Sequence, residues 1–295
     1  MPKYQMLYTD YLNLFKTYVV GVFPFVLFVN APHGKLAQPT VWFSRGYIPG
    51  RLGWVLMELV APVTFLYALQ QGNHSLAPGF VGDVCFRDLD LFRKASAFMF
   101  MIHYANRAIV GPLVFAPHVS PMHWTVFISA ILFNFLNGMS IGLYLLQATV
   151  QQHPVSLPWF IVGGLMWLFG WIGNLYHDNI LYDLRRRQPA KQQNNEPSQT
   201  SSPSSDEEVI SSFQSHYKIP YGGLFTYVSC PNYFCEWIEW FGCYLAAGMQ
   251  AEPIWWFFLA EVLLMLPRAY RIHSWYRSHF SRYPEDRHAV IPYLF

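Results

Sequence analysis

Long apolar runs dominate the pattern of hydrophobic and polar positions along this chain. A helix needs about 20 mostly apolar residues to cross the hydrocarbon core of a bilayer. Six runs approach or exceed this length, at residues 11–29, 52–70, 96–116, 124–149, 157–176 and 253–267. A seventh run, about 224–249, contains more polar residues. The pattern therefore predicts an all-α, polytopic membrane protein with seven transmembrane helices in a single domain, 1–295.

Composition supports the membrane class and excludes several others. Charged residues make up 12% of the chain, against roughly 25% in soluble domains. The formal charge of +2 and the lack of a Lys/Arg-rich block with interleaved stacking residues argue against nucleic-acid binding. The four cysteines form no CxxC pair and the eleven histidines form no HExxH motif, so no metal site is predicted.

Positive charge predicts the orientation in the membrane, because Lys- and Arg-rich short loops stay in the cytosol. The fifth apolar run is followed by Arg185, Arg186, Arg187 and Lys191, which places that loop in the cytosol. Counting spans in both directions puts the N-terminus in the lumen and the arginine-rich C-terminal tail in the cytosol. Asn73 then begins a lumenal Asn-His-Ser sequon, whose glycosylation the sequence leaves open.

Residues 188–215 interrupt the apolar pattern. They read QPAKQQNNEPSQTSSPSSDEEVISSFQS, which contains too few apolar residues to form a core. We expect this segment to be a disordered cytosolic insertion within the domain.

Ionisable residues inside apolar runs are costly and often mark functional sites. Glu58 is flanked by apolar residues, and His103, Tyr104 and Arg107 share one helical turn of the third run. A tyrosine hydroxyl supported by a carboxylate can stabilise a developing oxyanion. For Glu58 the alternative is a structural tie to another helix. An interfacial aromatic with an arginine that reaches the membrane surface explains Tyr104 and Arg107 about equally well from spacing alone.

Two further polar stripes follow helical spacing. Asn174, Asp178 and Arg185 fall on one face of the fifth helix. After a turn at Gly222-Gly223 and a helix start at Pro231, the polar positions Asn232, Glu236, Glu239 and Cys243 also share a face. Neither G-x-G-x-x-G after a strand nor a Walker motif is present. A bound dinucleotide would therefore lie among the helices, without a Rossmann domain.

The sequence resembles the steroid 5α-reductase (3-oxo-5α-steroid 4-dehydrogenase) family over about residues 30–295. The resemblance rests on the motifs YKIPYGGLFTYVSCPNYFCEWIEW, YPEDRHAVIPYLF, MIHYANRAIV, GNLYHDNILYDLR and WVLMELVAP. It implies a seven-helix, multi-pass protein of the endoplasmic reticulum membrane that uses NADPH to reduce the Δ4 double bond of a 3-oxo steroid. Hydride would go to C5 and a proton to C4.

The resemblance also implies roles for individual residues. Glu58 and Tyr104 fall where the family has the carboxylate and tyrosine that engage the 3-keto oxygen. Positions expected to contact NADPH are Arg107, Asn174, Asp178, Arg185, Tyr217, Asn232, Glu236, Arg268 and Tyr276. The expected partners are a steroid or sterol-like substrate and membrane lipid, with neither nucleic acid nor metal.

Three alternatives stay open at this point. The first is a related NADPH-dependent enone reductase acting on another lipid. The second is a membrane methyltransferase of the isoprenylcysteine carboxyl type, and the third is a non-catalytic sterol-binding protein. The natural substrate, the oligomeric state and the role of Glu239 are not determined by the sequence.

Overall fold

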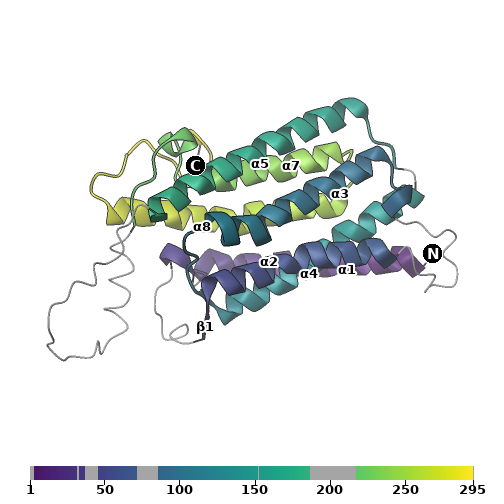
Figure 1. The fold of residues 1–295 in the computed structure, drawn as a ribbon, viewed down its shortest axis with the longest axis horizontal. Helices are drawn as coiled ribbons and strands as arrows, with labels where there is room; N and C mark the ends of the chain where they lie inside the picture. Colours follow the sequence, from purple (N-terminus) through teal and green to yellow (C-terminus); the bar gives the residue numbers. More distant parts are fainter. Residues whose placement is uncertain are drawn as a thin grey trace.

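In the computed structural model, the described part of the chain contains seven α-helices that run roughly along one axis (Figure 1). The structure describes residues 3–31, 33–36, 46–71, 86–151, 153–186 and 217–294. The helices are α1 (Lys3–Phe28), α2 (Gly50–Gln70), α3 (Leu91–Tyr104), α4 (Trp124–Val150), α5 (Leu157–Arg186), α7 (Pro231–Ala246) and α8 (Glu252–His279). The predicted insertion, 188–215, and the Asn73 sequon lie outside the described residues.

Five of these helices are long and apolar enough to cross a membrane by length and composition. They are α1, α2, α3 with its continuation to Phe115, α4 and α5. The all-α membrane architecture predicted from the sequence is thus confirmed. By contrast, α7 begins at Pro231, where the sequence predicts a helix start, and ends at Ala246, so it has only 16 residues of the apolar run 224–249. Transmembrane insertion of α7 and α8 stays a prediction.

The helices pack in two groups. In Figure 1, α5, α7 and α8 lie above α1, α2 and α4, with α3 between them. The most extensive contacts are those of α5 with α7 and of α2 with α4. The backbones of α5 and α7 approach closely at glycine positions. At Gly170 of α5, for example, an added Cβ would lie only 2.4 Å from the backbone nitrogen of Glu239 on α7. Small residues allow such close packing of helices in membranes, where the hydrophobic effect does not drive association.

A π-helix, η4 (Ala105–Phe115), continues α3 without a break. Pro112 lies inside it and has no N–H to donate, and Ala116 N donates to Gly111 O, five residues earlier. π-helical turns are rare and are often found at functional sites. This one begins directly after Tyr104 and carries Arg107.

Short elements fix the ends of the bundle. A two-stranded antiparallel pair joins β1 (Tyr47–Ile48) to β2 (Met122–His123). Three short 3-10 turns occupy Gly34–Leu36 (η1), Phe86–Asp88 (η3) and Gly223–Thr226 (η5). As the sequence predicts, Gly222 and Gly223 form the turn before α7, with φ of 101° and 54°. Ser229 N and Cys230 N then donate to His288 O and Ala289 O, which ties the start of α7 to the C-terminal motif.

Candidate active site

Arg107 is the centre of a buried network of charged side chains. Its Nε lies 3.4 Å from Glu58 Oε1, and its Nη1 lies 3.3 Å from Glu236 Oε1. Three separate elements supply these groups: α2 carries Glu58, η4 carries Arg107 and α7 carries Glu236. The guanidinium also sits over the Trp54 ring, 5.3 Å from its centroid, and Trp54 Nε1 donates to Arg107 O. Arg107 therefore joins two carboxylates that would otherwise be buried without a counter-ion.

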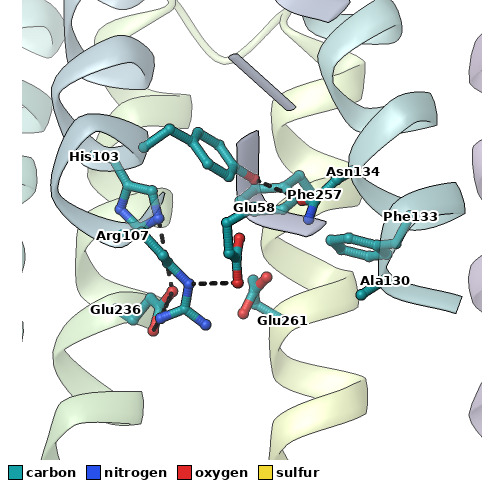
Figure 2. Close-up of a pocket in the computed structure, with 10 residues that line it drawn as sticks. Glu58, His103, Arg107, Ala130, Phe133, Asn134, Glu236, Phe257 and Glu261 are labelled. Atoms are coloured by element: carbon teal, nitrogen blue, oxygen red, sulfur yellow. Dashed lines mark hydrogen bonds and ion pairs between the residues drawn. The ribbon is translucent and has the colours of Figure 1, made fainter. Parts of the chain in front are cut away.

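A cavity of about 140 Å³ opens on one side of this network. Its polar lining comprises Glu58, His103, Tyr104, Arg107, Asn134, Glu236 and Glu261, and its apolar lining Ala130, Phe133 and Phe257. Figure 2 shows the carboxyl groups of Glu58 and Glu261 in the middle of this group, with Phe133 and Ala130 on one side. A cavity with an apolar wall and a few convergent polar groups is typical of a ligand site.

The Tyr104 hydroxyl is held by two asparagines of α4. It donates to Asn134 Oδ1 at 3.3 Å and accepts from Asn137 Nδ2 at 3.1 Å. Asn134 Nδ2 in turn donates to Met57 O on α2, 2.8 Å away. Tyr104 and Glu58, the two predicted catalytic residues, thus line the same cavity. Glu58 pairs with Arg107, and Tyr104 bonds to asparagines that the sequence prediction did not include.

A second polar cluster lies on the other side of Arg107. Asn174 Nδ2 donates to Glu236 Oε2 at 3.2 Å and to Asn232 O at 3.1 Å. Asn232 Nδ2 donates to Asp178 Oδ1 at 3.0 Å. A small cavity of about 30 Å³ is lined by Asn174, Asp178 and Arg107 together with Trp54, His103, Asn106, Gly111, Trp171 and Tyr182. The two predicted stripes, one on α5 and one on α7, therefore face each other.

The remaining predicted residues lie away from these two cavities. Arg185 Nη1 donates to His118 O at 3.1 Å, and Arg268 Nη2 donates to His33 O at 3.2 Å. Burial raises the pKa of Tyr217, while the positive charges of Arg185 and Arg268 oppose that shift, so both arginines are near this phenol. Tyr276 stacks on Tyr283, with ring centroids 5.3 Å apart. These four residues form a second, more basic group.

Arg268 has spare hydrogen-bonding capacity. Its Nε and Nη1 are buried and lack a hydrogen-bond partner within the described part of the chain. A buried guanidinium nitrogen without a partner is costly, and arginine matches phosphate oxygens particularly well. Together with Arg185, this residue suits the phosphates of a dinucleotide, so the chain's own residues fit such a cofactor.

Several residues of the site were not among the predicted ones. His103 Nδ1 lies 2.7 Å from Glu239 Oε1, which gives the previously unassigned Glu239 a partner. Asn134, Asn137 and Glu261 also belong to the cavity or its support. The sequence feature that could have identified these three residues is that each is a polar residue inside an apolar run.

Comparison with known proteins places the chain in a family. The family model described as 3-oxo-5-alpha-steroid 4-dehydrogenase matches residues 120–196 and 202–295. The mouse 3-oxo-5-alpha-steroid 4-dehydrogenase 1 is 31% identical, with 94% of each chain covered. The steroid 5-alpha-reductase DET2 of Gossypium hirsutum is 30% identical over 91% of this chain and 90% of its own.

A fission-yeast relative is more similar still. An uncharacterized protein of Schizosaccharomyces pombe is 63% identical over 98% of this chain and all of its own. The family match covers more than half of the sequence, and the similarity to the mouse and cotton enzymes extends across more than nine tenths of it. The chain therefore belongs to the 3-oxo-5-alpha-steroid 4-dehydrogenase family, a family of oxidoreductases.

Proposed function

We propose that this protein is an NADPH-dependent reductase of the Δ4 double bond of 3-oxo steroids, giving 5α-reduced products. The supporting observation is the position of Arg107, which pairs with Glu58 at the larger cavity and with Glu236 at the polar cluster. A ligand oxygen in the larger cavity and a cofactor amide near the polar cluster would thus lie on opposite sides of the Arg107 side chain. Relatives of this chain are named 3-oxo-5-alpha-steroid 4-dehydrogenase and steroid 5-alpha-reductase, which supports this choice of substrate class.

The larger cavity provides the groups that an enone reduction requires. When bound, NADPH supplies the hydride that adds to C5 of the steroid. Negative charge then develops on the 3-keto oxygen, and Tyr104 is the hydroxyl donor available to stabilise it. Asn137 donates to the Tyr104 oxygen, and the Tyr104 proton would have to turn from Asn134 Oδ1 toward the ligand oxygen. Phe133, Phe257 and Ala130 would contact the apolar rings and exclude water.

The polar cluster and the basic group would hold the cofactor. Asn174, Asp178, Asn232 and Glu236 present amide and carboxylate groups that suit a nicotinamide carboxamide. Arg185 and Arg268 would take the phosphates, with Tyr217 and Tyr276 beside them. We further propose that the protein resides in the endoplasmic reticulum membrane, with a lumenal N-terminus and cytosolic arginines.

The proposal is tested by expressing the chain in a membrane fraction and supplying NADPH with a panel of conjugated substrates. The panel includes 4-ene-3-oxo steroids, prenyl aldehydes and enoyl thioesters, and products are identified by mass spectrometry with stereochemical standards. We expect 5α-reduced steroids. Reduction of only the aldehydes or thioesters would assign another lipid substrate. Binding of S-adenosylmethionine but not NADPH would overturn the reductase proposal in favour of a methyltransferase.

A further inference from the structure

Glu261 is a carboxyl group of the larger cavity to which neither the sequence nor the proposed mechanism assigns a role. It lies on α8, its exposed fraction is only 9%, and it lines the cavity beside Glu58 and Tyr104. In Figure 2 its carboxyl group points toward that of Glu58. Within the described part of the chain, Glu261 makes neither a hydrogen bond nor an ion pair, whereas Glu58, Glu236 and Glu239 all have partners. Its polar atoms are therefore available to a ligand.

The charge balance of the site indicates the protonation state of Glu261. The charged and titratable groups facing it are Glu58 from α2, His103 and Tyr104 from α3, Arg107 from η4, and Glu236 and Glu239 from α7. Arg107 is shared by Glu58 and Glu236, and His103 contacts Glu239. From α4, only Ala130, Phe133 and Asn134 line this cavity.

No positive charge is left for Glu261 among the described groups that face it. An unpaired carboxylate in an apolar environment is so costly that the group takes up a proton instead. Glu261 then carries an O–H that can donate to an oxygen of a ligand. A carboxylic acid kept neutral in this way can form an oxyanion hole together with a tyrosine, as in ketosteroid isomerase.

Glu58 cannot donate a hydrogen bond to the ligand while it is paired with Arg107. As a carboxylate bound to the Arg107 guanidinium, Glu58 can only accept hydrogen bonds. The developing charge on the 3-keto oxygen requires donors, and Tyr104 supplies one of them. A second donor in a water-poor cavity adds substantially to transition-state stabilisation.

We propose that Glu261 is a catalytic residue which, together with Tyr104, donates a hydrogen bond to the carbonyl oxygen of the bound enone. This inference rests on the proposed function. Glu261 holds its own proton throughout, so its role is hydrogen bonding and not net proton transfer. It also implies that the cavity favours ligands with an accepting oxygen near α8 over apolar ligands without one.

The test compares three variants in the NADPH-dependent reduction of a 4-ene-3-oxo steroid. Glu261→Leu removes the donor and should lower kcat by about 10²- to 10³-fold, as loss of an oxyanion-hole donor does. Glu261→Gln keeps an N–H donor and should retain kcat within about tenfold of the wild type. Glu252→Gln is the matched control, because Glu252 begins the same helix and pairs with Lys16 outside the cavity.

Thermal unfolding separates a catalytic role from a structural one. Removing an unpaired buried carboxyl relieves a desolvation cost, so Glu261→Leu should unfold at or above the wild-type temperature. A wild-type kcat in Glu261→Leu would overturn the proposal. A loss of kcat accompanied by an equally large loss of folded protein in both Glu261 variants would overturn it as well, in favour of a packing role.

A binding measurement tests the inference without turnover. A steroid with a phenolic A ring places an oxygen where the enone oxygen would lie and, when ionised, imitates the developing charge. Its affinity, measured by quenching of tryptophan fluorescence, should fall at least tenfold in Glu261→Leu and stay unchanged in Glu252→Gln. Equal affinity of the phenolic steroid for the wild type and for Glu261→Leu would contradict the role of Glu261 but would leave the proposed function standing. No binding to the wild type, with no reduction of any steroid, contradicts the proposed function itself.

Discussion

Tyr104 is a residue whose function depends on a single oxygen atom. Its ring packs against Phe100 and His103, with centroid distances of 4.7 and 5.1 Å, and those contacts do not involve the hydroxyl. Tyr104→Phe should therefore lower kcat for a 4-ene-3-oxo steroid by about 10²- to 10³-fold with little change in KM, because only a transition-state donor is lost. Steady-state kinetics checks this. The control is that the variant still folds, with a fall in unfolding temperature no larger than the loss of the two asparagine hydrogen bonds explains. An unchanged kcat would remove Tyr104 from the mechanism.

Arg107 is expected to matter for stability as well as for activity. Arg107→Met leaves Glu58 and Glu236 without their counter-ion, and breaking a buried pair costs about 3–5 kcal/mol. We expect a clear drop in the thermal unfolding midpoint of the purified protein.

Neutralising the partners provides the control for this prediction. Glu58→Gln and Glu236→Gln introduced together with Arg107→Met should restore much of the stability, because the uncompensated charges are gone. They should not restore reduction. A single Arg107→Met variant that unfolds at the wild-type temperature would contradict the proposed network.

At the residue scale, sequence reasoning recovered side chains that follow helical periodicity. Asn174 with Asp178, and Asn232 with Glu236, are one turn apart, so spacing predicts that each pair shares a face. Asn137 and Glu261 were missed for a physical reason. Glu261 is an isolated polar residue in its apolar run, and Asn137 lies in a short row of uncharged polar residues on α4; only the packing of α4 and α8 around the cavity gives them a role.

The α5 and α7 helices must approach closely for the polar cluster to form. Gly170 permits this, since an added Cβ would lie 2.4 Å from Glu239 N and 2.6 Å from Cys235 O. Gly170→Leu should force the helices apart, lengthen the Asn174–Glu236 contact, and weaken NADPH binding at least tenfold. Fluorescence titration of purified protein with NADPH measures this.

Gly164 provides the matched control on the same helix. A Cβ there would meet only the Met99 methyl at 3.7 Å, which is an ordinary contact. Gly164→Ala should thus keep NADPH affinity and gain a little helix stability, since glycine is a poor helix former. Equal affinity in Gly170→Leu and Gly164→Ala would show that the close approach is unnecessary for binding.

Element boundaries were less predictable than element types. The apolar run at 224–249 overlaps the η5 turn, so the start of α7 was predicted from the proline at position 231 and not from hydrophobicity. Similarly, the π-helix after Tyr104 depends on hydrogen-bond register, which the apolar pattern of 96–116 does not encode. The number of long helices was predictable because membrane insertion requires long apolar runs.

Orientation is a property of the whole molecule that charge predicts. If the arginine-rich C-terminal end is cytosolic and the N-terminus lumenal, an epitope after Phe295 should be cleaved by protease in sealed microsomes. An epitope before Met1 should be protected until detergent is added. Protection of both epitopes, or cleavage of both, would contradict the predicted odd number of spans.

The cofactor contacts proposed here come from η4, α5, α7 and α8, so NADPH should stabilise the molecule as a whole. A ligand that binds only the folded state adds about 2.7 kcal/mol at 100 times its Kd. We expect NADPH to raise the unfolding midpoint of the purified protein. Arg268→Ala should weaken NADPH about 10- to 100-fold, since its buried nitrogens lose a charge-assisted bond.

Arg277 is the control for this measurement, because it lies on the same helix and its side chain is exposed. Arg277→Ala should leave the NADPH-induced shift intact. Both variants remove one positive charge. If NADPH were held only by the general attraction of the basic tail for phosphate, both variants would therefore lose the same part of the NADPH-induced shift. A selective loss in Arg268→Ala would instead locate the phosphates between α8 and α5. An equal shift in the wild type and Arg268→Ala would contradict that placement.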